Sequence, residues 1–180
     1  GGPTLYHTNY DSFHFYEKFV DPTFQMGGMV EQVAGMMALK MANADVIPYD
    51  LERYASDLKM HFRDAEKMVA AYDKDFKGFA QSWEAINKLQ ESTTGFASAL
   101  EKALQERKYA AKEAQRINQQ LIGLEKSFLD EKGMYFGRWY QSLYASTDPF
   151  SGYASWILPG IRYETEQQSS ERLQEWDQRY

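Results

Sequence analysis

The feature that most constrains the fold is an apolar stretch from Phe24 to Ala44, FQMGGMVEQVAGMMALKMANA, in which only Glu31 and Lys40 are charged. Its apolar side chains recur at helical spacing and extend beyond one stripe: Met26, Met29, Val30, Val33, Met36, Met37, Leu39 and Met41. A helix that is apolar over most of its circumference must be surrounded, so the stretch predicts the central helix of an α-helical domain. The alternative is a methionine-lined ligand groove. The charges and the interspersed glycines argue against a membrane span.

The composition is that of a globular domain and excludes several classes of function. A chain of 180 residues with 26% charged and 16% aromatic residues fits one domain with tails. A net charge of −6 and the lack of a basic run argue against a nucleic-acid surface. The absence of cysteine excludes disulfides and thiolate chemistry. We expect no membrane contact by this segment. Its compartment cannot be read from these residues, which are compatible with an exported or membrane-anchored parent.

Amphipathic periodicity predicts further helices on both sides of a charged break near residues 105–109. Asp11 and Ser12 offer an N-cap for a short helix over Phe13–Val20, and Asp50 offers one for a helix that begins at Leu51. The predicted apolar stripes span Leu51–Tyr72, Phe79–Leu104 and Ala114–Phe128. No heptad persists across the break, so we expect two antiparallel helices there rather than one.

The helical period is lost from residue 133 to residue 160, a stretch rich in Gly, Tyr, Trp and Phe. Irregular loops of this length are usually functional or interface-forming. The polar tail beyond Arg162 carries one amphipathic turn at Leu173, Trp176 and Tyr180, and it ends without a stop signal, as if clipped. The predicted fold class is therefore all-α, a bundle of four to five helices with a long irregular aromatic loop.

The chain lacks the residue patterns of a complete enzyme. Its histidines, His7, His14 and His61, are not at metal-pair spacing, and no nucleophile elbow, P-loop or dinucleotide fingerprint is present. A lone histidine is more often a surface residue than a ligand. We therefore expect no enzymatic activity from this segment alone.

Motifs spread in order along the chain carry a resemblance to a known family: Tyr6–Phe13, Glu17–Phe19, Asp21–Pro22, Ala42–Asn43, Val46–Asp50, Tyr54–Ala55, Leu124–Glu125 with Phe128 and Asp130, Gly152–Tyr153 and Leu158–Ile161. The chain resembles the transferrin receptor-like dimerisation domain that follows the zinc peptidase domain in the glutamate carboxypeptidase II (prostate-specific membrane antigen) family. The resemblance implies a leading segment, residues 1–10, from a missing peptidase domain, and a dimerisation domain over residues 11–180.

The resemblance also implies roles for two adjacent residues. His7 matches the histidine that is the last ligand of the family's two-zinc centre, and Tyr6 matches the tyrosine that donates a hydrogen bond to the substrate or its tetrahedral intermediate. Neutral imidazole is a good zinc ligand, and a phenol beside it can stabilise an oxyanion. The remaining ligands and the general base would lie in the missing domain. We therefore expect two zinc ions in the parent enzyme and none in this segment.

In glutamate-preferring members, the resemblance places a lysine and a tyrosine against the C-terminal glutamate of the substrate. Tyr153 matches the tyrosine, but Gly152 stands in place of the lysine, and a glycine cannot pair with a carboxylate. We therefore expect a broader carboxypeptidase or aminopeptidase. The alternative is that Tyr153 is a packed loop aromatic.

The function implied is homodimerisation of a di-zinc exopeptidase that acts on peptides, with this chain contributing to the active site of its own peptidase domain. The alternative from the residues alone is a stand-alone helical ligand-binding or protein-interaction bundle.

Overall fold

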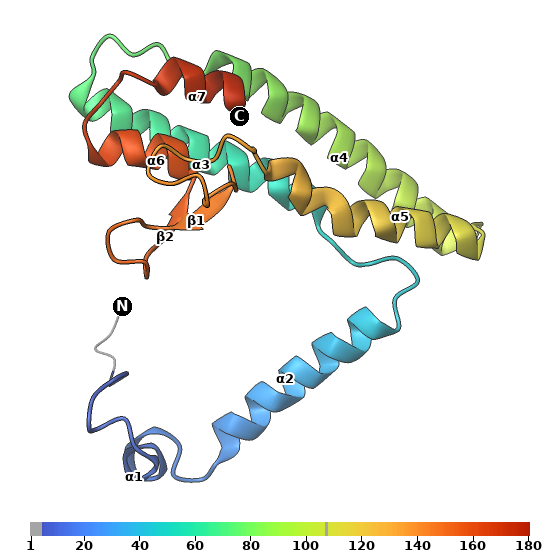
Figure 1. The fold of residues 1–180 in the computed structure, drawn as a ribbon. Coiled ribbons are helices and arrows are strands. Elements are labelled where there is room, and N and C mark those ends of the chain that lie inside the picture. The colour runs from blue at the N-terminus through green and yellow to red at the C-terminus, as the bar shows by residue number, and fades with distance from the viewer. Residues whose placement is uncertain (1–4, 107) are drawn as a thin grey trace. The chain divides into compact units, whose positions relative to one another are not determined.

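The computed structural model describes residues 5–106 and 108–180, which fall into two compact units divided between Pro48 and Tyr49 (Figure 1). All-α architecture is confirmed: α-helices account for most of the regular structure in the described residues, beside one two-stranded sheet. None of the helices in this part of the chain has the length and apolarity that crossing a bilayer requires.

The first unit contains α1 (Phe13–Phe15), a π-helical turn (Tyr16–Val20) and α2 (Gln25–Ala42). The predicted cap is confirmed, since the Ser12 side chain accepts a hydrogen bond from the backbone N–H of Phe15. The carboxylate of Asp21 accepts hydrogen bonds from the backbone N–H groups of Gln25, Met26 and Gly27, so it caps the first turn of α2.

The prediction that the Phe24–Ala44 stretch is a buried central helix is wrong in one respect. The helix forms, as α2, but none of its residues is buried, and its five methionines are exposed. The other helical turns of this unit also contribute no buried residue. A helix of this composition needs amphipathic elements packed against its apolar surface, and the other elements of its own unit do not bury it.

The second unit is built on α3 (Leu51–Tyr72) and α4 (Ala80–Glu106), which pack along one another (Figure 1). The side chain of Asp50 accepts from the N–H of Arg53, as the predicted cap. The chain then breaks, as predicted, and continues as α5 (Ala111–Gly123) with a 3₁₀ turn (Leu124–Phe128). The sequence spacing therefore located these helices to within a few residues.

The core of this unit is formed by the apolar face of α3 and the elements that cover it. The buried residues of this face are Ala55, Leu58, Phe62, Ala65 and Val69. The last four of these belong to one core cluster with residues that include Phe79, Ile86, Leu158, Ile161, Leu173 and Trp176. Each fully buried large apolar side chain contributes about 1.5–3 kcal/mol, so this cluster is the main source of stability.

The region predicted as an irregular loop and polar tail contains more regular structure than expected. A short antiparallel hairpin pairs β1 (Ala145–Thr147) with β2 (Ser155–Ile157). Helix α6 (Pro159–Glu166) follows at once, and α7 (Leu173–Arg179) includes the predicted amphipathic turn. These strands have three residues each, and α6 is short and starts at a proline. Elements of this length are too short to show a periodic pattern in the sequence.

Helix α7 is tied to the start of α4. The carboxylate of Asp177 accepts hydrogen bonds from the backbone N–H groups of Gln81 (3.1 Å) and Ser82 (2.8 Å) and from the Ser82 hydroxyl. These N–H groups have no partner within α4, because they belong to its first turn. A residue near the end of the chain thus caps the longest helix.

Candidate functional site

The hairpin β1–β2 is closed by a connecting segment, residues 148–154, that leads from β1 into β2. The strands pair in register from Ala145 with Ile157 to Thr147 with Ser155. The N–H of Leu158 donates to the carbonyl oxygen of Tyr144 (2.9 Å), which joins the hairpin base to the start of α6. Trp156 of β2 is buried, with its ring 6.0 Å from that of Phe136. The base of the hairpin is therefore fixed, and its tip holds Gly152 and Tyr153.

One buried carboxylate organises this tip. Asp148 Oδ1 accepts hydrogen bonds from the N–H groups of Phe150 (2.9 Å) and Ser151, and Oδ2 accepts from the Ser151 hydroxyl and from the N–H of Ala154 (2.9 Å). The side-chain and backbone hydrogen bonds from Ser151 are the largest causes that lower the pKa of Asp148, to about 2. The carboxylate is therefore ionised at neutral pH, and it satisfies donors that would otherwise be unpaired.

The two predicted site residues in the tip are adjacent and exposed. Gly152 has a φ of +72°, a left-handed conformation that glycine adopts without strain, and its N–H donates to the carbonyl oxygen of Asp148. Tyr153 is 79% exposed, and its N–H donates to the Ser151 hydroxyl (3.2 Å). Tyr153 is thus not a packed loop aromatic.

The other two predicted site residues lie in the first unit. Tyr6 and His7 are both exposed, and their rings stack with centroids 3.7 Å apart. His7 has a φ of +65°, which is uncommon for a residue with a side chain. The structure brings Tyr6 together with His7, and Gly152 together with Tyr153, each pair within its own unit.

A zinc site is not assembled within the described residues. Catalytic zinc sites use three protein ligands, usually histidine, cysteine or carboxylate. Within residues 5–106 and 108–180, no group of three or more such side chains could hold a metal ion. His7 alone offers one imidazole, fewer donors than a zinc site uses.

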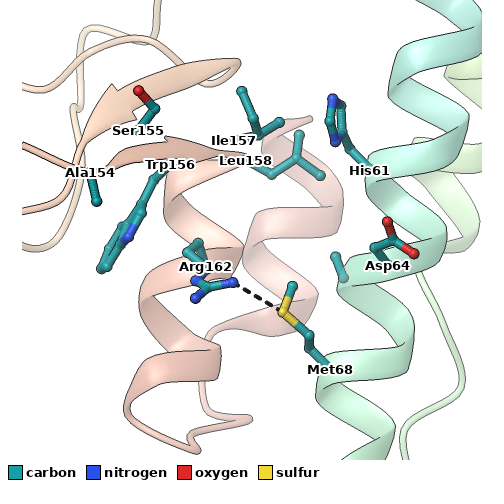
Figure 2. A pocket seen from close by; sticks show the side chains of 10 residues that line it. His61, Asp64, Met68, Ala154, Ser155, Trp156, Ile157, Leu158 and Arg162 are labelled. Carbon is teal, nitrogen blue, oxygen red and sulfur yellow. Dashed lines mark hydrogen bonds between the residues drawn. The ribbon is translucent and has the colours of Figure 1, made fainter. Parts of the chain in front are cut away.

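A pocket of about 400 Å³ lies between α3, β2 and α6 (Figure 2). His61 and Trp156 line it, and Figure 2 shows Arg162 donating to the sulfur of Met68, at 3.2 Å. The charged residues at its wall are engaged within the chain: Arg162 pairs with Glu166 and Asp64 pairs with Lys67. We therefore interpret the pocket as a packing feature.

Sequence reasoning named Gly152 and Tyr153 but missed Asp148, the residue that shapes their loop. The signal was available in the run Asp-Pro-Phe-Ser-Gly at residues 148–152, because aspartate, proline, serine and glycine are the residues that build tight turns.

Comparison with known proteins gives the chain a family. Residues 63–180 match the transferrin receptor-like dimerisation domain. A probable glutamate carboxypeptidase of Arabidopsis thaliana, LAMP1, is 30% identical over 160 residues, which are 89% of this chain and 22% of that protein. A probable glutamate carboxypeptidase of Zea mays, VP8, is 26% identical over 87% of this chain and 22% of its own length. The aminopeptidase NAALADL1 of Mus musculus is 24% identical over 83% of this chain and 21% of its own.

This chain therefore spans about a fifth of the length of these relatives. The family match covers well over half of the chain and includes the second part of α3 and the later helices and strands of the described residues. The all-α fold agrees with that match, and the motifs at residues 124–130, 152–153 and 158–161 lie within it. The chain belongs to the transferrin receptor-like dimerisation domain family.

Proposed function

We propose that this chain is the homodimerisation part of a di-zinc exopeptidase of the glutamate carboxypeptidase type, and that it also contributes residues to the active site of its parent. The observation that carries the proposal is the family match over residues 63–180, together with relatives that are named glutamate carboxypeptidases and an aminopeptidase. In this proposal residues 1–10 lead out of a peptidase domain, and residues 11–180 form the dimerisation domain.

Exposed apolar surface supports an interaction role. Helix α2 presents five exposed methionines, and in the second unit Trp139 is 92% exposed. Clusters of exposed large apolar side chains usually mark interfaces, and methionine suits them because its side chain is adaptable. A homodimer of this kind buries about 2,000 Å² or more when it is obligate.

The dimer is tested by sedimentation velocity of the 180-residue chain over a wide range of concentration. We expect a concentration-dependent species of twice the monomer mass. A chain that stays monomeric throughout contradicts autonomous dimerisation. The matched variant is Trp139→Ser, which removes an exposed aromatic side chain without touching the core, compared with Lys88→Ser on the solvent face of α4.

The active-site roles are proposed for two pairs of residues. His7 supplies one zinc ligand, and Tyr6 donates a hydrogen bond to the substrate or the tetrahedral intermediate. Tyr153, exposed on its hairpin tip, contacts the substrate, and Gly152 leaves the neighbouring position without a cation. The expected substrate is therefore a peptide whose terminal residue need not be glutamate.

These roles are tested in a chain that includes the proposed peptidase domain. His7→Ala should lower the zinc content measured by atomic emission, whereas His14→Ala, an exposed histidine of α1, should not. Tyr6→Phe should lower kcat with unchanged zinc content, because a hydrogen bond to the developing oxyanion acts in the transition state. Full zinc content in the His7→Ala variant would contradict the ligand role.

A further inference from the structure

Two features hold the hairpin tip that carries Tyr153: the carboxylate of Asp148, and the ring of Phe150, which lies 5.9 Å from that of Trp156 and 6.5 Å from that of Tyr163. Phe150 and Tyr153 are both exposed, and nothing lies within 4 Å of a Cβ built on Gly152. The tip is therefore not packed against the core around Gly152 and Tyr153. A segment without apolar packing is ordered only if its backbone hydrogen-bond groups are satisfied.

Asp148 satisfies them from inside the loop. Its carboxylate binds three backbone N–H groups, those of Phe150, Ser151 and Ala154, and the hydroxyl of Ser151. Its backbone N–H and carbonyl oxygen also bond, to the carbonyl oxygen of Ala154 and the N–H of Gly152. The Ser151 hydroxyl in turn accepts from the N–H of Tyr153, so the network reaches the proposed substrate-contacting residue through one intermediate atom.

The network is local. All of the hydrogen-bond partners of the Asp148 side chain lie within residues 150–154, and none belongs to a helix. Removing the carboxylate should therefore release the tip while the helical core remains folded. A residue whose effect is confined to one loop is suited to control that loop, rather than the fold.

We propose that Asp148 is a positioning residue for Tyr153: it holds the hairpin tip in the conformation that presents the phenol to a peptide substrate before the substrate arrives. The inference rests on the proposed substrate contact of Tyr153. Pre-organisation acts by removing the entropy cost of ordering the loop at the moment of binding. The consequence is expressed in substrate affinity rather than in the chemical step.

Loop order is measured by ¹⁵N relaxation on the 180-residue chain. In the wild type, the amides of Gly152 and Tyr153 should have order parameters close to the value of about 0.85 that is typical of rigid backbone, and in Asp148→Ala they should fall below about 0.6. Helical amide shifts should not change. The matched control is Asp73→Ala, which removes a carboxylate that accepts from Asp75 N–H and the Ser170 hydroxyl in another loop of the same unit. A mobile tip in the wild type, or a rigid tip in Asp148→Ala, overturns the inference.

A double-mutant cycle in the chain with its peptidase domain tests the link to substrate. Tyr153→Ala should raise KM for a peptide substrate. Asp148→Ala should raise KM with kcat little changed, and should add nothing in the Tyr153→Ala background, because it acts through that residue. Asp148→Asn, which keeps one carbonyl acceptor, should restore part of the affinity.

The outcomes separate the two ideas. If Tyr153→Ala leaves KM unchanged, the proposed substrate contact fails, whatever the relaxation data give for Asp148. If Tyr153→Ala raises KM but Asp148→Ala does not, or if the two effects add fully, the contact stands and the positioning role is wrong.

Discussion

Gly160 and Trp176 approach so closely that a Cβ built on Gly160 would lie 2.6 Å from atoms of the indole ring. Gly160 is in the first turn of α6 and Trp176 is fully buried in α7, so this contact sets how near the two helices pack. The glycine of the Leu158–Ile161 motif is thus required by packing in the helical core.

Gly160→Ala should destabilise the second unit by about 1–3 kcal/mol, because the added methyl group forces the indole or the helix to shift in a dense core. Urea unfolding followed by tryptophan fluorescence measures the change. The control is Gly95→Ala in α4, where nothing lies within 4 Å of the added atom. Alanine there should raise stability by up to about 1 kcal/mol through helix propensity. Equal effects of the two variants would contradict this explanation.

Asp177→Ala should cost about 1–2 kcal/mol, because it removes the cap from the first turn of α4 and leaves the Ser82 N–H and hydroxyl without this partner. Thermal unfolding by circular dichroism measures the loss. Asp64→Ala, at an exposed ion pair on α3, is the comparison and should change stability by no more than about 0.5 kcal/mol. If Asp177→Ala lowered the stability by no more than Asp64→Ala does, the cap would not be stabilising.

The pair Arg179–Asp130 is largely buried: the Arg179 side chain is 7% exposed, with Nε 2.8 Å from Asp130 Oδ2, and Arg179 also donates to the carbonyl oxygen of Gly133. Arg179→Met should destabilise by about 3–5 kcal/mol, because it leaves a partly buried carboxylate without its partner. The exposed pair Arg53–Asp57 gives the contrast, and Arg53→Met should cost no more than about 1 kcal/mol. Chemical denaturation of both variants measures the two losses of unfolding free energy, and equal losses would contradict a larger contribution from the buried pair.

Asp148 should make stability depend on pH in an acidic window. Its folded-state pKa is about 2, below the value of about 3.9 for an unperturbed aspartate. The unfolded chain therefore takes up the proton first, so the contribution is complete above about pH 4 and is lost as the pH falls from about 4 to about 2. Urea unfolding at several pH values should show the difference between wild type and Asp148→Asn shrinking across this window. A difference that is constant with pH would contradict the ionised network.

Helices were predictable from the sequence where one face could be read over several turns. The stripes of α3 and α4 and the caps at Ser12 and Asp50 follow from local spacing and side-chain chemistry. The hairpin and α6 were not predictable in the same way, because their stability comes from contacts such as Trp156 with Phe136 and Gly160 with Trp176, which link distant parts of the sequence.

The predicted burial of α2, by contrast, was wrong. Its composition correctly predicts a helix, but periodicity cannot tell which molecule or segment covers an apolar helix. The site shows the same limit. The resemblance singled out Gly152 and Tyr153, whereas the role of Asp148 depends on hydrogen bonds that only coordinates reveal.

The cap on α4 has a consequence for biosynthesis. Asp177 follows Ser82 by 95 residues, so on the ribosome the first turn of α4 emerges long before the carboxylate that satisfies it. Contacts of such large sequence separation slow folding and leave nascent chains exposed to misassembly. This helical unit is therefore completed only after Asp177 has been translated, and a chain released before that point would present an unfinished helix end to chaperones and proteases.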